Sequence, residues 1–215
     1  MYIEVKDAVK KYGTGESELY ALNHVSLTLE KGEICVILGP SGSGKSTLLN
    51  MLGGMDHLDA GSITIDGQEI TKLSRKALGE YRRKKIGVVF QSYNLIPELT
   101  VRENIRVVED ISQNPLSLSE LLEKLGLTDH ATRRALIKNP VLLLCDEPTG
   151  ALDSVSSREV LRMLAEVNEA YHTTIVMITH NEGIAQMADR VVRIHDGQII
   201  SNLKQQKKKV EELEI

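Results

Sequence analysis

A run of glycine and serine that ends in lysine and serine is the most specific chemical pattern in the sequence. It spans residues 39–46, reads GPSGSGKS, and fits a phosphate-binding loop at every required position. Glycines let backbone amides curl around a phosphate chain, Lys45 adds a mobile cation, and the Ser46 hydroxyl suits Mg²⁺. We therefore predict a phosphate-binding site made of Gly39, Ser41, Gly42, Ser43, Gly44, Lys45, Ser46 and Thr47.

Two adjacent acidic residues form the second chemical element. Asp146 and Glu147 follow an apolar run, Val141 to Cys145. A buried strand that ends in Asp brings a carboxylate to a metal ion at the carboxyl edge of a sheet. The next side chain points elsewhere, so Glu147 is suited to orient or deprotonate a water molecule. We predict that Asp146 joins Ser46 as a Mg²⁺ ligand.

These residues need a sheet with its strand ends gathered at one edge, and the apolar pattern predicts one. A continuous apolar run at 34–38 precedes the glycine loop, and a helical stretch at 45–52 follows it, which is the order strand, loop, helix. Further along, strands alternate with helices, which favours a parallel sheet flanked by helices. These elements are strands 86–90, 141–145 and 173–179 and helices 154–171 and 181–188.

Other segments predict smaller elements. Residues 25–29 alternate as a half-buried strand, and 74–85 form a basic helix. Two hairpins, at 63–70 and 191–200, each place Asp-Gly between apolar strands. The charged tail at 204–215 is predicted to be solvated or loosely helical.

Composition limits the class of protein. The 215 residues carry a net charge of −4, which gives no basic field for nucleic acid. No apolar run approaches the roughly 20 residues that span a bilayer, and the first residues lack the order of a signal peptide. Cys35 and Cys145 lie in apolar runs and read as buried, reduced thiols. We expect a cytoplasmic chain that reaches a membrane only through a partner.

Residues 146–153, DEPTGALD, resemble the corresponding motif of ABC transporter ATPases, and the resemblance covers nearly the whole chain. It implies an α/β P-loop NTPase fold with a mainly parallel core sheet, an N-terminal antiparallel β subdomain and a small helical lobe. It also implies ATP and Mg²⁺ as ligands, ATP hydrolysis, and a homodimer that forms on ATP binding. Roles follow for three more residues: Tyr12 stacks on adenine, Gln91 senses the metal, and His180 contacts the γ-phosphate.

Several short segments, including Tyr93 to Pro97, resemble the branch of the family that is paired with FtsX-like permeases. That branch includes lipoprotein-release, macrolide-export and antimicrobial-peptide resistance systems. The resemblance implies a permease partner contacted through Gln91 to Leu99, no nucleic-acid partner, and a peripheral place at the inner face of the cell membrane. An ordinary exposed loop at 91–99 is the alternative.

One part of the family pattern is missing. We expect a single domain over 1–215, with the core in about 1–90 and 141–200 and the helical lobe in about 91–140. The glycine-containing signature segment, which caps the γ-phosphate of the opposite subunit, is absent near 130–131, and the interval from Gln91 to Asp146 is on the order of twenty residues short. Either a segment is left out of the printed sequence between His130 and Ala131, which we favour, or it is truly absent.

True absence would give a nucleotide binder with impaired hydrolysis, because donors for the γ-phosphate would be lost. Two other classes remain open from the sequence. One is a P-loop kinase that phosphorylates a small acceptor, and the other is an ABC protein that works on DNA or ribosomes rather than in transport. Asp153 and His180 argue against the first, and the acidic charge argues against the second.

Overall fold

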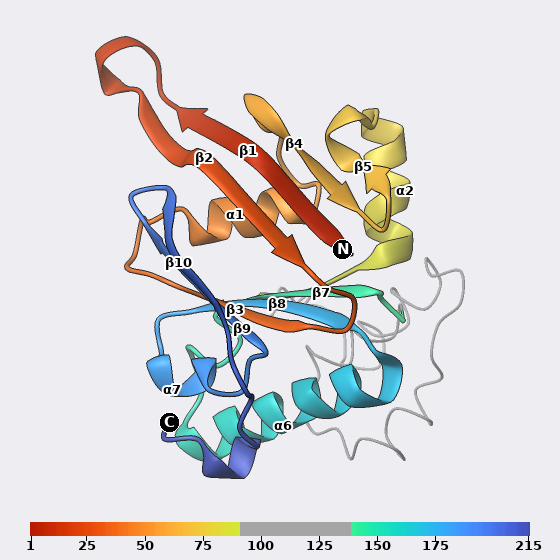
Figure 1. Cartoon of the computed structure of the whole chain (residues 1–215), viewed down its shortest axis with the longest axis vertical. Coiled ribbons are helices and arrows are strands. Elements are labelled where there is room, and N and C mark those ends of the chain that lie inside the picture. The colour runs from red at the N-terminus through yellow and green to blue at the C-terminus, as the bar shows by residue number, and fades with distance from the viewer. Residues whose placement is uncertain (91–138) are drawn as a thin grey trace, which may run out of the picture.

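Two β-sheets of different kinds make up the part of the chain that the computed structural model describes, residues 1–90 and 139–215 (Figure 1). The first is antiparallel, in the order β2-β1-β4-β5. The second has the order β10-β9-β3-β8-β7-β6, and all its neighbouring strands are parallel except β10, which is antiparallel to β9. The expected mainly parallel core sheet and N-terminal antiparallel sheet are confirmed. The strands are β1 (Ile3–Tyr12), β2 (Leu19–Leu29), β3 (Ile34–Leu38), β4 (Ala60–Ile65), β5 (Gln68–Glu69), β6 (Ile86–Val89), β7 (Leu142–Asp146), β8 (Thr174–Thr179), β9 (Arg190–His195) and β10 (Gln198–Lys204).

The mainly parallel sheet is buried on both faces, as its continuous apolar strands predict. In β3, Val36 contributes to the core on one face, and its neighbours Cys35 and Ile37 contribute to the core on the other. The same alternation holds in β7 and β8. Cys35 and Cys145 are buried free thiols, as predicted.

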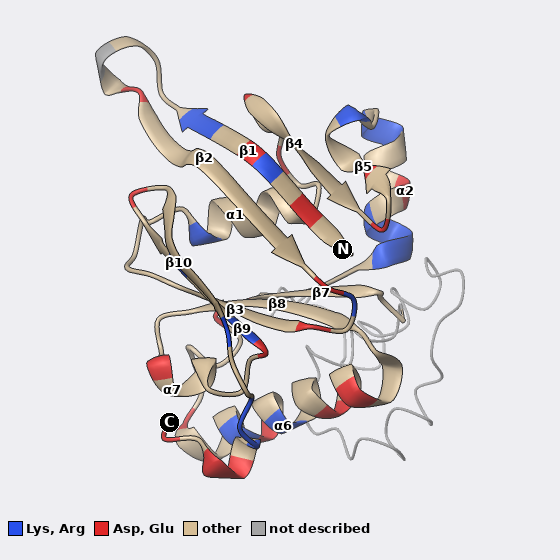
Figure 2. Cartoon of the chain, viewed as in Figure 1, with Lys and Arg blue, Asp and Glu red and all other residues tan. Residues whose placement is uncertain are grey.

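Among the residues that the structure describes, four α-helices cover the sheets. The first, α1 (Lys45–Leu52), packs between the two sheets, and α2 (Arg75–Lys85) begins at Ser74, whose hydroxyl accepts a hydrogen bond from the Ala77 amide. Figure 2 shows the basic last turn of α2 in blue. On the opposite face of the parallel sheet lie α6 (Ser154–Tyr171), capped by Asp153, and α7 (Glu182–Ala185), which is shorter than the predicted 181–188. The described ranges also hold three short 3₁₀ helices, which are η1 (Gly15–Ser17), η2 (Ile70–Lys72) and η3 (Val210–Glu212).

Both predicted Asp-Gly hairpins are present. Asp66 and Gly67 have φ angles of 53° and 73°, and Asp196 and Gly197 have 47° and 72°, which is the positive-φ pair of a tight hairpin turn. The second turn also reaches across the molecule, because the Gly197 amide donates to the Ser43 carbonyl at 3.0 Å and the Asn23 amide donates to the Gly197 carbonyl at 2.8 Å.

The tail was predicted to be solvated or loosely helical; its last part does form the short helix η3, but the solvated alternative is wrong there. Val210 and Leu213 are buried against the core beneath α6. Arg158 of α6 donates to the carbonyls of both residues, at 3.3 and 3.0 Å. Two buried apolar side chains three residues apart, together with the hydrogen bonds of Arg158, dock this charged segment. Within the described ranges, no helix has the length and apolar character needed to cross a bilayer.

Candidate active site

A pocket of about 580 Å³ lies where the carboxyl ends of β3, β7 and β8 meet. It gathers ten of the predicted site residues: Tyr12, Ser41, Gly42, Gly44, Lys45, Ser46, Thr47, Asp146, Glu147 and His180. Three lining residues were missed by the sequence analysis: Leu19, Ala21 and Ile178. Leu19 and Ala21 belong to the edge strand β2, and the alternation predicted for this strand covered only residues 25–29.

The phosphate-binding loop folds as its glycines require. Gly44 has a φ of 102°, and a Cβ there would lie 2.2 Å from the Ala21 carbonyl oxygen. The loop is held together by Lys45, whose ammonium group donates to the carbonyls of Gly39 and Pro40 at 2.7 Å each. No side chain caps α1, so the first-turn amides of this helix face the pocket region without an intrahelical partner. Uncapped amides and a nearby cation are what an anionic phosphate chain needs.

Gly39 and Ser43 do not line the pocket but form the side of the loop that packs on β9. A Cβ on Gly39 would lie 2.3 Å from the carbonyl oxygen of Ile194 in β9. The Ser43 hydroxyl is buried, and among the described residues it has no hydrogen-bond partner. These two residues therefore lie on the side of the loop that faces β9, while the other predicted loop residues line the pocket.

The acidic pair lies at the end of β7, directly beside β8. Glu147 has a φ of 47°, a left-handed backbone conformation that a non-glycine residue adopts at a cost and that often marks a functional site. Its carboxylate lies 3.0 and 3.1 Å from Nδ1 of His180 and accepts a hydrogen bond from the Thr179 hydroxyl at 3.4 Å. The structure thus brings Glu147 and His180 into direct contact.

Charge in the pocket is held at an energetic cost. Burial raises the pKa of Asp146, and the charge of Glu147 raises it further, while Lys45 opposes both. Burial lowers the pKa of Lys45, and the two carboxylates oppose that shift. A divalent cation would stabilise the Asp146 carboxylate, and a phosphate chain would stabilise the Lys45 ammonium group, because each brings the opposite charge.

The donor set fits Mg²⁺. Ser46 and Asp146 both line the pocket and offer one hydroxyl and one carboxylate, which are the hard oxygen ligands that this ion prefers. Among residues 1–90 and 139–215, no cluster of three His, Cys, Asp or Glu side chains could hold a metal ion alone. An ion bound here would take its remaining ligands from phosphates and water, as Mg²⁺ commonly does. Gln91, the segment to Leu99 and most of the predicted helical lobe lie outside the described residues.

Comparisons with known proteins agree with the resemblance to ABC transporter ATPases. The model of the ABC transporter family matches residues 22–135. The putative ABC transporter ATP-binding protein MG065 homolog of Mycoplasma pneumoniae is 39% identical over 92% of this chain, which spans 46% of that protein. The macrolide export ATP-binding/permease protein MacB of Aggregatibacter actinomycetemcomitans is 39% identical over 93% of this chain, which spans 34% of that protein. A solved dimeric structure of the ATP-binding cassette MJ0796 in a post-hydrolysis state, bound to ADP and Pi, has a TM-score of 0.86 and 33% identity, covering 96% of this chain and all of that one.

The lengths of these alignments bear on the missing segment. The first relative aligns over 216 positions, yet 92% of 215 residues is about 198, so some 18 positions have no counterpart in this chain. For MacB the same arithmetic gives 221 positions against about 200 residues. The shortfall of about twenty residues agrees with the predicted one. Both explanations of the missing segment, residues left out between His130 and Ala131 or a true absence, stay predictions.

Proposed function

Because the chain belongs to the ABC transporter family, we propose that it is the ATP-binding and ATP-hydrolysing motor subunit of a transporter. Two copies close over two ATP molecules, and closure and reopening drive a membrane partner. The observation that best supports this is the single pocket in which the loop around Lys45 faces the acidic pair and His180. A small-acceptor kinase is not supported by this family membership.

Each residue of the pocket has a proposed part. The amides around Gly42 and Gly44 and the Lys45 ammonium hold the phosphates, with Gly39, Ser41, Ser43 and Thr47 completing the loop. Ser46 and Asp146, with Gln91, would hold Mg²⁺, which supplies neutralising charge at the phosphate oxygens when bound. Glu147 orients or deprotonates the attacking water, His180 contacts the γ-phosphate, and Tyr12 stacks on the adenine.

The partner proposed is a membrane permease of the FtsX-like kind. The MacB relatives, named as ATP-binding/permease proteins, support this, since this chain aligns with about a third of their length. Contact is proposed through Gln91 to Leu99, at the cytoplasmic face of the membrane. We propose no nucleic-acid partner.

A second candidate function is an ATP-binding subunit with little turnover. It is favoured by the roughly twenty positions that relatives have and this chain lacks. Phosphoryl transfer depends on positioned donors around the γ-phosphate, so a chain without the signature segment would bind ATP in the same pocket and hydrolyse it slowly.

Calorimetry and phosphate release on the purified chain test both candidates. Glu147→Gln is compared with the parent chain, and Glu169→Gln on an exposed part of α6 is the matched control. Tight Mg·ATP binding with hydrolysis that only Glu147→Gln abolishes supports the motor. Equal binding with parent hydrolysis no faster than that of Glu147→Gln supports the second candidate. Absence of ATP binding by the parent chain rejects both.

A further inference from the structure

We propose that Asp56, paired with Lys10, is a positioning residue that fixes the ring of Tyr12 as the platform for the nucleotide base. The inference rests on the proposed function, because it concerns the base-binding end of the same pocket. It assigns a role to two residues that were not among the predicted site residues.

The contacts of the Asp56 carboxylate carry the argument. One oxygen accepts a hydrogen bond from the Tyr12 hydroxyl at 2.9 Å. The other accepts from the Lys10 ammonium at 3.1 Å and from the His57 amide at 2.7 Å. Lys10 also donates to the His57 carbonyl at 2.8 Å. Both carboxylate oxygens are thus engaged within the protein, and one of the engaged groups is the hydroxyl of Tyr12.

Asp56 is itself held by the end of α1. Gly54 has a φ of 61°, its amide donates to the Met51 carbonyl at 3.0 Å, and the Met55 amide donates to the Asn50 carbonyl at 2.9 Å. These two bonds are the pair of a Schellman motif, which sets the direction of the chain after a helix. Asp56 is the next residue. The helix that starts at Lys45 therefore places Asp56 at its other end.

Lys10 and Tyr12 face this loop from β1. The Lys10 ammonium lies over the Tyr12 ring, 5.1 Å from its centroid, and its side chain is only 11% exposed. A base can therefore stack only on the other face of the ring. Tyr12 is 45% exposed and lines the pocket together with Thr47 of α1. The ring is thus anchored on one side and at its hydroxyl, and it is open toward the phosphate-binding loop.

The protonation states suit these contacts. Burial raises the pKa of the Asp56 carboxyl, but hydrogen bonds from the His57 amide, Lys10 and Tyr12 outweigh it, so the pKa lies below its ordinary value. Burial raises the pKa of Tyr12, and the hydrogen bond and charge of Asp56 raise it further. At neutral pH an ionised acceptor therefore meets a protonated donor, which is a charge-assisted hydrogen bond.

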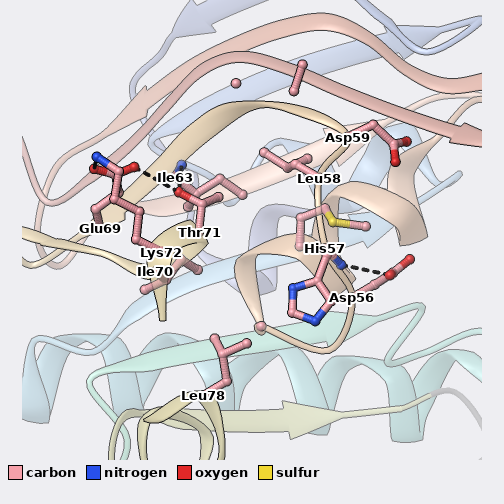
Figure 3. A pocket seen from close by; sticks show the side chains of 14 residues that line it. Asp56, His57, Leu58, Asp59, Ile63, Glu69, Ile70, Thr71, Lys72 and Leu78 are labelled. Carbon is pink, nitrogen blue, oxygen red and sulfur yellow. Dashed lines mark hydrogen bonds and ion pairs between the residues drawn. The ribbon is translucent and has the colours of Figure 1, made fainter. Parts of the chain in front are cut away.

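The far side of the Asp56 loop lines a separate pocket of about 230 Å³ (Figure 3). Its acidic groups are already paired: Asp59 accepts from the Lys11 amide at 2.6 Å, and Glu69 pairs with Lys72 at 2.8 Å. Figure 3 shows Asp56 at the edge of this pocket, bonded to the His57 backbone. We therefore assign the function of Asp56 to its hydrogen bond with Tyr12 and not to this second pocket.

The test compares a ligand that has a base with one that has none. Calorimetry measures Mg·ATP and Mg·tripolyphosphate binding to the parent chain, Asp56→Asn, Tyr12→Ala and the double variant. We expect Asp56→Asn to weaken ATP binding about threefold to tenfold and Tyr12→Ala about fivefold to a hundredfold, since loss of base stacking acts on ATP alone. Tripolyphosphate affinity should stay within about twofold in all four, and the double variant should bind ATP no more weakly than Tyr12→Ala.

Asp66→Asn is the matched control, because Asp66 lies in the β4–β5 turn, pairs with Lys85 at 3.2 Å, and Asn-Gly suits the same turn. The inference would be overturned if Asp56→Asn weakened ATP and tripolyphosphate binding equally or left ATP affinity unchanged. It would also be overturned if Asp56→Asn still weakened ATP binding in the Tyr12→Ala background. If Asp56→Asn does not fold, Lys10→Met tests the same coupling with the same expected pattern. A parent chain that binds neither ligand would reject the proposed function as well, which separates the two failures.

Discussion

Lys45→Met removes the ammonium group of the phosphate-binding loop and keeps an unbranched apolar side chain in its place. Lys45 is 8% exposed, so the packed stem matters and alanine would leave a gap. The ammonium holds the loop by two hydrogen bonds of 2.7 Å, to the carbonyls of Gly39 and Pro40. Met retains the packing and loses these bonds together with the charge.

The expected loss of affinity follows from two opposing terms. A cation about 4 Å from one phosphate charge contributes about 4 kcal/mol at an effective dielectric constant of about 20. Giving up hydrogen bonds to the loop carbonyls offsets roughly 2 kcal/mol of this. The net of about 2 kcal/mol predicts that Lys45→Met weakens Mg·ATP binding about thirtyfold.

The unfolding free energy should change less than the binding free energy. The Lys45 charge is partly desolvated in the loop, and this burial lowers its pKa. Losing two hydrogen bonds and losing a buried charge act in opposite directions, so the unfolding free energy should move by no more than about 1 kcal/mol. Lys76→Met, at an exposed site on α2, is the control for charge and side-chain type.

Calorimetric titration with Mg·ATP and urea denaturation are the assays. ATP affinity within twofold of the parent chain would refute the assignment of Lys45 to the phosphates. A loss of several kcal/mol of stability would refute the reasoning in another way, because weak binding would then reflect a damaged fold.

Two further predictions concern neighbouring residues. Burial raises the folded-state pKa of Asp146, so the folded parent chain loses stability as pH rises through that pKa and the carboxyl ionises. Without nucleotide at pH 7, Asp146→Asn should therefore unfold at a higher urea concentration than the parent chain, and the difference between the two urea midpoints should close as pH falls below about 4. A difference in midpoint that does not depend on pH would contradict this. Gly44→Ala should lower the unfolding free energy by about 2–4 kcal/mol, because the φ angle of Gly44 is 102° and the new Cβ would lie 2.2 Å from the Ala21 carbonyl oxygen. Gly79→Ala in α2 is its control, since a Cβ there meets nothing within 4 Å and should raise the unfolding free energy by up to about 1 kcal/mol. Equal urea midpoints for the two variants would refute the steric argument.

The local patterns of the sequence predicted the chemistry of the pocket and the type of sheet that supports it. The glycine loop, the acids after β7 and the Asp-Gly turns each depend on spacings within a few residues, which physical rules connect directly to structure. The parallel character of the core sheet followed from the alternation of strands and helices along the sequence. These features could be inferred because their causes are local.

Features that depend on distant pairs could not be found in this way. Tyr12 and Asp56 are 44 residues apart, and the buried ion pair of Arg190 and Glu33, at 2.8 Å, joins residues 157 apart. No periodicity relates a strand residue to a loop residue of another element. The docked tail was missed because the prediction followed its charged composition, whereas two of its apolar side chains are buried.

The hairpin turn at Gly197 gives the site a particular order of assembly during synthesis. The Gly197 amide binds the carbonyl of Ser43 in the phosphate-binding loop, although the two residues are 154 positions apart. Its own carbonyl receives the Asn23 amide of β2, so the turn joins the loop to the edge of the other sheet. A growing chain has made the whole loop long before it makes this turn, and contacts so far apart form late. The ribosome-bound chain therefore carries the phosphate-binding sequence without these contacts until residue 197 has emerged, and a ligand that needs the finished loop can stabilise the fold only after that point.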